Sequence, residues 1–156
     1  MLADFPEKVP LIESARLLTR DWVQWMRSLL LAVNGLSDTW APIDASGAGL
    51  TFTNTSGNCS YLKVGSVVQA TFRVTYPATA SGADALIGGL PFTAKNTTAS
   101  VYGGVISSTD ETTAARVLVT TNATTFAVLT SAGGAVTNAT LSGNDLRGTV
   151  TYTAAS

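Results

Sequence analysis

Histidine is absent from this chain of 156 residues, and charged residues make up only 12% of it. Without histidine the chain cannot build a Ser-His-Asp or Cys-His nucleophile system, and it lacks the commonest metal ligand. Soluble domains usually contain about twice this fraction of charged residues. Because few charges leave little electrostatic repulsion between copies, we expect the chain to form oligomers.

Cysteine is also scarce: Cys59 is the only one, so no disulfide can form within the chain. This usage is typical of a protein assembled in a reducing cytoplasm. The first residues, Met1 to Pro6, lack the charged and apolar regions of a signal peptide. The longest apolar run, Leu29 to Val33, is far too short to span a bilayer, so we expect no membrane insertion.

The remaining composition argues against catalysis and nucleic acid binding. The net charge is −1 and no basic stripe exists, so binding of nucleic acid has no electrostatic support. No glycine pair precedes Lys-Ser or Lys-Thr, as a phosphate loop requires. Asp110 and Glu111 are adjacent, but they lie in a predicted turn rather than across a cleft, as a glycosidase dyad would. We expect no enzyme, no metal and no cofactor.

One helix is predicted, over residues 19–35. Thr19 can cap its first turn, Asp21 lies at the positive end of the helix dipole, and Asn34 with Gly35 supply the stop. Apolar residues recur at spacings of three and four and share one face: Trp22, Trp25, Met26, Leu29, Leu30 and Val33.

A helix this short is marginal alone in water, so its apolar face needs a covering surface. Either it packs on the chain's own β domain, or copies of the helix meet around a symmetry axis or dock on a partner protein. We favour the second alternative, because a separate all-β pattern with its own apolar residues follows.

Residues 1–18 are predicted to form an extended N-terminal arm, since Pro6 and Pro10 favour extended backbone. Residues 11–18 could instead extend the helix. The arm also has apolar side chains that could anchor it in a neighbouring protein: Phe5, Val9, Leu11 and Ile12.

The rest of the chain is predicted to be a linker, residues 36–49, and an antiparallel β-sandwich of jelly-roll type, residues 50–156. The clearest strand is Ser66–Tyr76, which alternates apolar and polar residues. Other predicted strands are Leu50–Thr53, Ser60–Val64, Ala85–Gly88, Ser100–Ser107, Ala115–Thr120, Thr125–Thr130 and Asp145–Thr153. Their solvent faces carry mostly Thr and Ser, which indicates either ordinary surface chemistry or a packing surface between identical subunits.

Two sets of motifs resemble small bacteriophage structural proteins. The run from Leu18 to Met26, with its following leucines, is similar to a "LT-x-x-W" helix near the start of many such proteins. The β region resembles receptor-binding or fibre domains of phage tails in three motifs: Trp40-Ala-Pro-Ile, Tyr61-Leu-Lys-Val-Gly-Ser-Val-Val and Ile87-Gly-Gly-Leu-Pro-Phe92. Together these motifs cover about residues 18–92.

The resemblance implies a homotrimer that is assembled in the host cytoplasm and located in the virion. Its N-terminal arm would bind other virion proteins of the tail, collar or capsid, and its β domain would contact a host cell-surface glycan or protein. Candidate tip loops contain Thr79, Ser81, Asp84, Thr109, Asp110 and Glu111. A short tail-associated fibre is the leading expectation. The alternatives are a capsid decoration or head-fibre protein and, last, a carbohydrate-binding module.

Overall fold

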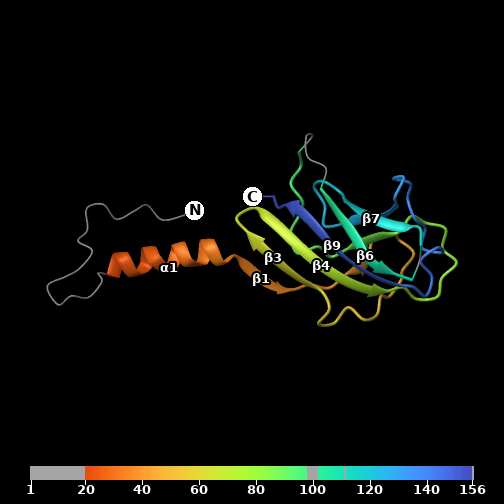
Figure 1. Ribbon diagram of the computed structural model, residues 1–156, viewed down its shortest axis with the longest axis horizontal. Helices are drawn as coiled ribbons and strands as arrows, with labels where there is room; N and C mark the ends of the chain where they lie inside the picture. The colour runs from red at the N-terminus through yellow and green to blue at the C-terminus, as the bar shows by residue number, and fades with distance from the viewer. Residues whose placement is uncertain (1–19, 98–101, 111, 156) are drawn as a thin grey trace. The chain divides into compact units, whose positions relative to one another are not determined.

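The structure, a computed structural model, describes residues 20–97, 102–110 and 112–155. The chain divides into two compact units, Met1–Leu36 and Ser37–Ser156. The described residues form one helix, α1 (Arg20–Asn34), and nine strands (Figure 1). The strands are β1 (Leu36–Thr39), β2 (Ile43–Asp44), β3 (Ser60–Val64), β4 (Val67–Thr75), β5 (Leu86–Gly88), β6 (Gly103–Thr109), β7 (Ala114–Val119), β8 (Phe126–Thr130) and β9 (Asp145–Thr153).

The helix α1 follows the prediction closely. It begins at Arg20, has Asp21 in its first turn and ends at Asn34. Gly35 then takes a φ of 72°, the left-handed conformation that glycine adopts without a Cβ penalty, so the predicted stop is confirmed. Thr19, the predicted cap, and the predicted arm lie outside the described residues.

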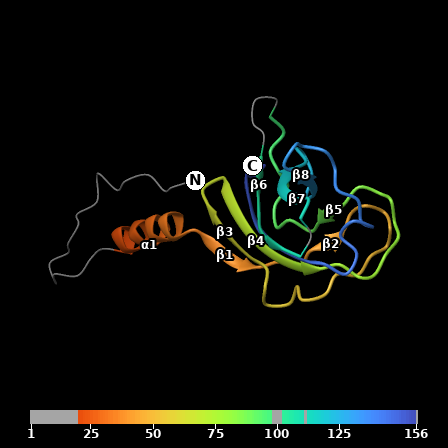
Figure 2. The ribbon, with the colours of Figure 1, turned by 45° about the vertical axis from the view of Figure 1, so that its right-hand side comes forward.

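All nine strands belong to one sheet, in the order β1-β3-β4-β9-β6-β7-β8-β5-β2. The pairs with a described register are antiparallel, and the longest joins β4 to β9 from Val67 opposite Thr153 to Thr75 opposite Asp145. The edge strands β1 and β2 are separated in the chain by residues 40–42 alone, so the sheet must curl to bring its edges together. Figure 2 shows this curl, with β3 and β4 on one side and β7, β8 and β5 on the other.

The core fills the concave side of the curled sheet, which is a half-barrel. The rings of Phe72 on β4 and Phe126 on β8 lie 5.2 Å apart, although three strands, β9, β6 and β7, lie between β4 and β8 in the order of the sheet. Trp40 is buried and its indole N–H donates to Thr71 O. This hydrogen bond holds residues 40–42, which join the edge strands β1 and β2, against β4. The prediction of a mainly β protein with one N-terminal helix is therefore confirmed.

Glycine allows β6 and β9 to cross closely at the centre of the sheet. Gly148 lies opposite Phe72 and opposite Ile106, where a Cβ atom would come within 2.7 Å of the Phe72 ring and 2.5 Å of Val105 O. A Cβ on Gly104 would overlap Thr149 O. Because the backbones approach so closely here, the sheet can bend around its core at these two positions.

Two parts of the strand prediction were wrong. Residues 36–49 were expected to be a linker, but they contain the edge strands β1 and β2. Leu50–Thr53 was expected to be a strand, but only Thr53 bridges to another residue, Thr75. The Leu50 N–H instead donates to the Asp44 carboxylate, which holds this segment in a loop.

The β unit has two distinct ends. At the hairpin end, the turn between β3 and β4 contacts the residue that follows β9, since Ala154 N donates to Ser66 O. Trp40 N donates to Cys59 O, so β1 runs antiparallel to β3 and begins at this same end. At the opposite, loop end lie the segments 76–85, 110–113 and 131–144, as the strand registers require.

Candidate functional site

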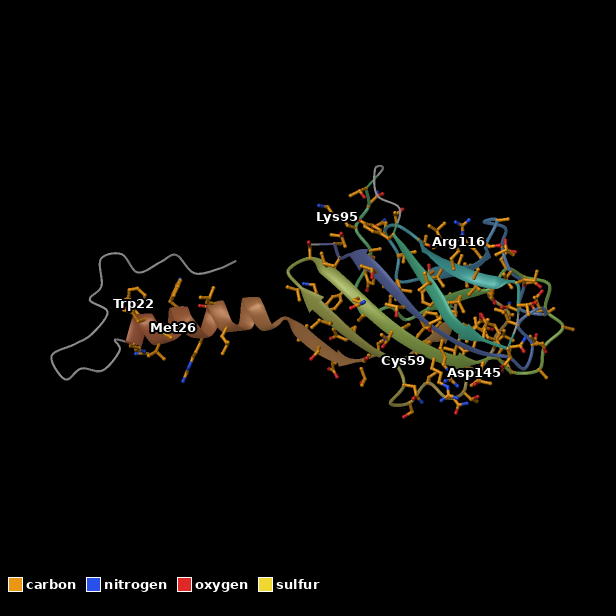
Figure 3. All side chains as sticks on the ribbon, viewed as in Figure 1. Trp22, Met26, Cys59, Lys95, Arg116 and Asp145 are labelled. Carbon is orange, nitrogen blue, oxygen red and sulfur yellow. The ribbon has the colours of Figure 1, made fainter. Side chains whose placement is uncertain are left out.

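The apolar side of α1 is the first candidate surface. Met26 is 48% exposed and Leu30 is 60% exposed, while Trp22, Trp25 and Leu29 are half-buried. The two tryptophan rings meet edge to face at 5.7 Å. Figure 3 shows the side chains of Trp22 and Met26 on the helix. Large apolar side chains left in water at this density are typical of a contact surface rather than of a monomer's exterior.

A shallow groove runs along this side, with a volume of about 300 Å³. It is lined by Val23, Met26, Arg27 and Leu30. Five of the six predicted oligomerising side chains are therefore described, and none of them is fully buried within the chain. The side chain of Val33 and the predicted arm residues, Phe5, Val9, Leu11 and Ile12, lie outside the described residues.

The loop end of the β unit is the second candidate surface. The structure brings the predicted tip residues Thr79, Ser81 and Asp84 to this end together with Thr109 and Asp110; Glu111 lies outside the described residues. The segment 77–85 runs beside 136–144 through backbone hydrogen bonds, including Ala139 N to Ser81 O at 2.8 Å. Backbone hydrogen bonds therefore hold these two segments together as one paired structure.

A partly buried polar network links these loops to the residues that follow β2. The Asp44 carboxylate accepts hydrogen bonds from the Ser46 hydroxyl and from the N–H groups of Ser46 and Leu50. Burial alone would raise the pKa of Asp44, but these hydrogen bonds outweigh it and hold the pKa below its ordinary value. Asn138 is fully buried and its amide N–H donates to Ser46 Oγ at 2.8 Å, which ties the segment 136–144 to the residues after β2.

Two arginines on the outside of the sheet share one carboxylate. Arg73 on β4 and Arg147 on β9 are register partners, and both donate to Asp145, at 3.1 Å from the Nη2 atom of Arg73 and 2.8 Å from that of Arg147. Burial would raise the pKa of Asp145, but the hydrogen bonds and charges of the two guanidinium groups lower it overall. Figure 3 places Asp145 near the loop end of the sheet. Sequence reasoning missed this cluster, because only the register brings residues 72 positions apart together.

The outer sheet face is a third surface, formed by the outward side chains of β3, β4, β9 and β6 between Arg73 and the hairpin end. These positions of the four strands carry no charged side chain, and the exposed Arg116 on β7, the register partner of Val105, borders them. Four of its aliphatic residues are well exposed: Val105 at 59%, Val67 at 52%, Val64 at 45% and Leu62 at 42%. The other members are polar and mostly threonine: Ser60, Gln69, Thr71, Thr149, Thr151 and Thr153.

A hollow of about 440 Å³ borders this face at β6 and β7, lined by Gly103, Gly104, Arg116, Val117, Leu118, Leu129 and Gly133. Its floor lacks side chains because β6 contributes two glycines there. The Arg116 Nε–H donates to Thr130 O at 3.2 Å, so one hydrogen bond holds this guanidinium against the adjacent turn. No aromatic side chain lines the hollow.

None of the aromatic side chains described in the β unit is exposed. Phe92, the last residue of the Ile87-Gly-Gly-Leu-Pro-Phe92 motif, is half-buried. Its ring meets that of Tyr61 edge to face at 5.4 Å, and the Lys63 ammonium lies 5.3 Å from its centre. The described part of the β unit therefore offers no flat aromatic platform on which a sugar ring could stack.

Comparisons with protein-family models, with curated protein sequences and with solved structures find no match. Within the described residues, no helix has the length and hydrophobicity needed to cross a membrane. Likewise, no cluster of three or more Asp, Glu, Cys or His side chains suited to a metal ion occurs in the part of the chain that the structure describes.

Proposed function

We propose that this chain is a non-enzymatic bacteriophage virion protein, a short trimeric tail-associated fibre. In this proposal the N-terminal arm attaches to other virion proteins, α1 joins three copies, and the β unit contacts the host surface or a partner fibre. The curled sheet serves as a compact, sandwich-like head, since its two halves face each other across the Phe72–Phe126 contact.

The observation that carries the proposal is the apolar side of α1, on which Met26 and Leu30 remain largely exposed. Trp22, Met26, Leu29 and Val33 are spaced by four, three and four residues, which is the spacing of core positions in a coiled coil. Burying one such side chain contributes roughly 1.5–3 kcal/mol. Three copies that share this stripe would therefore gain enough to offset the cost of association.

The two-ended β unit supports the outward role of the loops. β1 begins at the hairpin end directly after Gly35, whereas the candidate tip loops lie at the opposite end. Because the helix joins the β unit at the hairpin end, the proposal assigns the receptor contact to the segments 76–85 and 131–144 at the loop end. Their mutual hydrogen bonds would keep this surface ordered before contact with a receptor.

The runner-up function is a capsid decoration or head-fibre protein, which would use the same parts on the shell instead of the tail. A carbohydrate-binding module ranks last, because the described aromatic side chains of the β unit are buried or half-buried. Host glycans remain a candidate ligand of the loops through hydrogen bonds alone.

The experiment that tests this proposal compares the full chain with one lacking residues 1–18. We expect both to be trimers by light scattering, and only the full chain to be incorporated into particles. Labelled antibody on virions then separates tail from capsid. A chain that stays monomeric, or that never associates with particles, would contradict the proposal.

A further inference from the structure

We infer that the outer sheet face is a second contact between copies of this chain, so that the β units of neighbouring subunits pack side by side. The inference rests on the proposed trimer and names where its β units meet. The contact is formed by the outward side chains of β3 and β4 and continues onto β9 and β6.

The distribution of charge singles out this face. Every outward position of β4 from Val67 to Thr71 is uncharged, and so is every outward position of β9 from Thr149 to Thr153. Lys63 on β3 belongs to the opposite side, where its ammonium lies near the Phe92 ring. Interface cores are depleted in charged residues, whereas an ordinary solvated sheet face carries them.

Removing the side chains of this face from water also costs little free energy. Val64 and Val67 are register partners and both are about half exposed, at 45% and 52%, so they form one aliphatic pair at the hairpin end. Beyond them, the Ser60 and Thr71 hydroxyl groups already hydrogen-bond to each other at 2.9 Å. A polar pair that keeps its partner on burial avoids most of the cost of desolvation.

A second copy is the occupant that the chain itself supplies. Gly35 is the only residue between the end of α1 and the start of β1, and β1 is the sheet neighbour of β3. Three helices that share an axis would therefore bring the hairpin ends of three β units near one another, because β1 begins at that end one residue after α1. Tethering of this kind raises the effective concentration of the tethered surfaces to about the millimolar range, so a modest contact is sufficient.

Hydroxyl-radical footprinting of the full chain tests the inference, with the assembly-defective double variant Trp22→Asp and Leu29→Asp as comparator. We expect Leu62, Val64 and Val67 to lose labelling in the assembled wild type relative to the variant. Ile43, which is 58% exposed at the other edge of the sheet, should be labelled equally in both. A charge substitution adds a second readout: Val67→Asp should lower the melting temperature of the trimer, whereas the control Ile43→Asp should not.

The outcomes separate the two proposals. A trimer in which Leu62, Val64 and Val67 are labelled as strongly as in the dissociated variant overturns the inference and leaves the proposed function standing. Equal effects of Val67→Asp and Ile43→Asp on the trimer overturn it as well. A monomeric wild-type chain overturns both.

Discussion

Phe72 and Gly148 face each other across the pair formed by β4 and β9, with the ring covering the glycine. An added Cβ would come within 2.7 Å of the ring and 2.5 Å of Val105 O. The Phe72 ring also lies 5.2 Å from that of Phe126, so this position couples a close backbone approach to an aromatic contact of the core.

Gly148→Ala should therefore destabilise the β unit by about 1–3 kcal/mol, because overpacking forces the ring or the strand to move. The measurement is chemical denaturation followed by circular dichroism. Gly82→Ala is the matched control, since no atom lies within 4 Å of the position where its Cβ would be placed. Equal stability of the two variants would show that β9 can shift without cost.

The apolar stripe of α1 should control assembly without controlling the fold of the β unit. Trp22→Asp combined with Leu29→Asp should dissociate the proposed trimer, because charges would enter the core that its three helices would share. The circular dichroism spectrum of this variant should still show that the β unit is folded. The control Gln24→Asp with Ser28→Asp adds two charges to the other side of the helix and should leave the mass unchanged; equal dissociation by both pairs would argue against a specific stripe.

Asp145 should make the β unit sensitive to acid. Its pKa is lower in the folded state than in the unfolded state. Between these two pKa values the unfolded chain binds more protons, so the free energy of unfolding rises with pH. The contribution is complete above the ordinary carboxyl value and is lost as pH falls below about 4 and through the folded pKa. Asp44, whose pKa is also lowered, should contribute in the same direction.

The Asp145→Asn variant should lose roughly 1–3 kcal/mol at neutral pH, because two guanidinium groups lose their shared charged acceptor. Its stability should also depend less on pH than that of the wild type in urea titrations at successive pH values. Asp84→Asn, an exposed site at the same end, is the control. An unchanged acid profile in Asp145→Asn would contradict the assigned role of the cluster.

Cys59 should be protected from thiol reagents in the folded protein. Its side chain is 1% exposed, its sulfur contacts the Arg73 backbone, and burial raises the pKa of the thiol. Ellman's reagent should react slowly under native conditions and rapidly in denaturant, since the thiolate is the reactive form. Rapid native labelling would mean that β3 separates readily from β4.

Much of the β unit could be predicted from alternation of apolar and polar residues. The bounds of Ser60–Val64 and Asp145–Thr153 were predicted as the structure has them, because more exposed side chains alternate with more buried ones along each strand. β1 and β2 escaped prediction, since Leu36–Thr39 is exposed along its whole length and Ile43–Asp44 has only two residues. Edge strands of this kind carry no periodic pattern.

The candidate surfaces were only partly accessible to sequence reasoning. The helix stripe is local, so spacing alone identified Trp22, Met26 and Leu29. That Thr79 and Thr109 lie at the same end of the β unit could not be predicted from local spacing, because it depends on which strands pair and in what direction. The same holds for Arg73 and Asp145, whose contact depends on the register of β4 with β9.

The mass of the full chain in solution is the most direct test of the central claim, that the apolar side of α1 is covered by other copies. Light scattering over a range of protein concentrations should give three times the chain mass of 16.0 kDa. A stable species of 16.0 kDa at every concentration would contradict it.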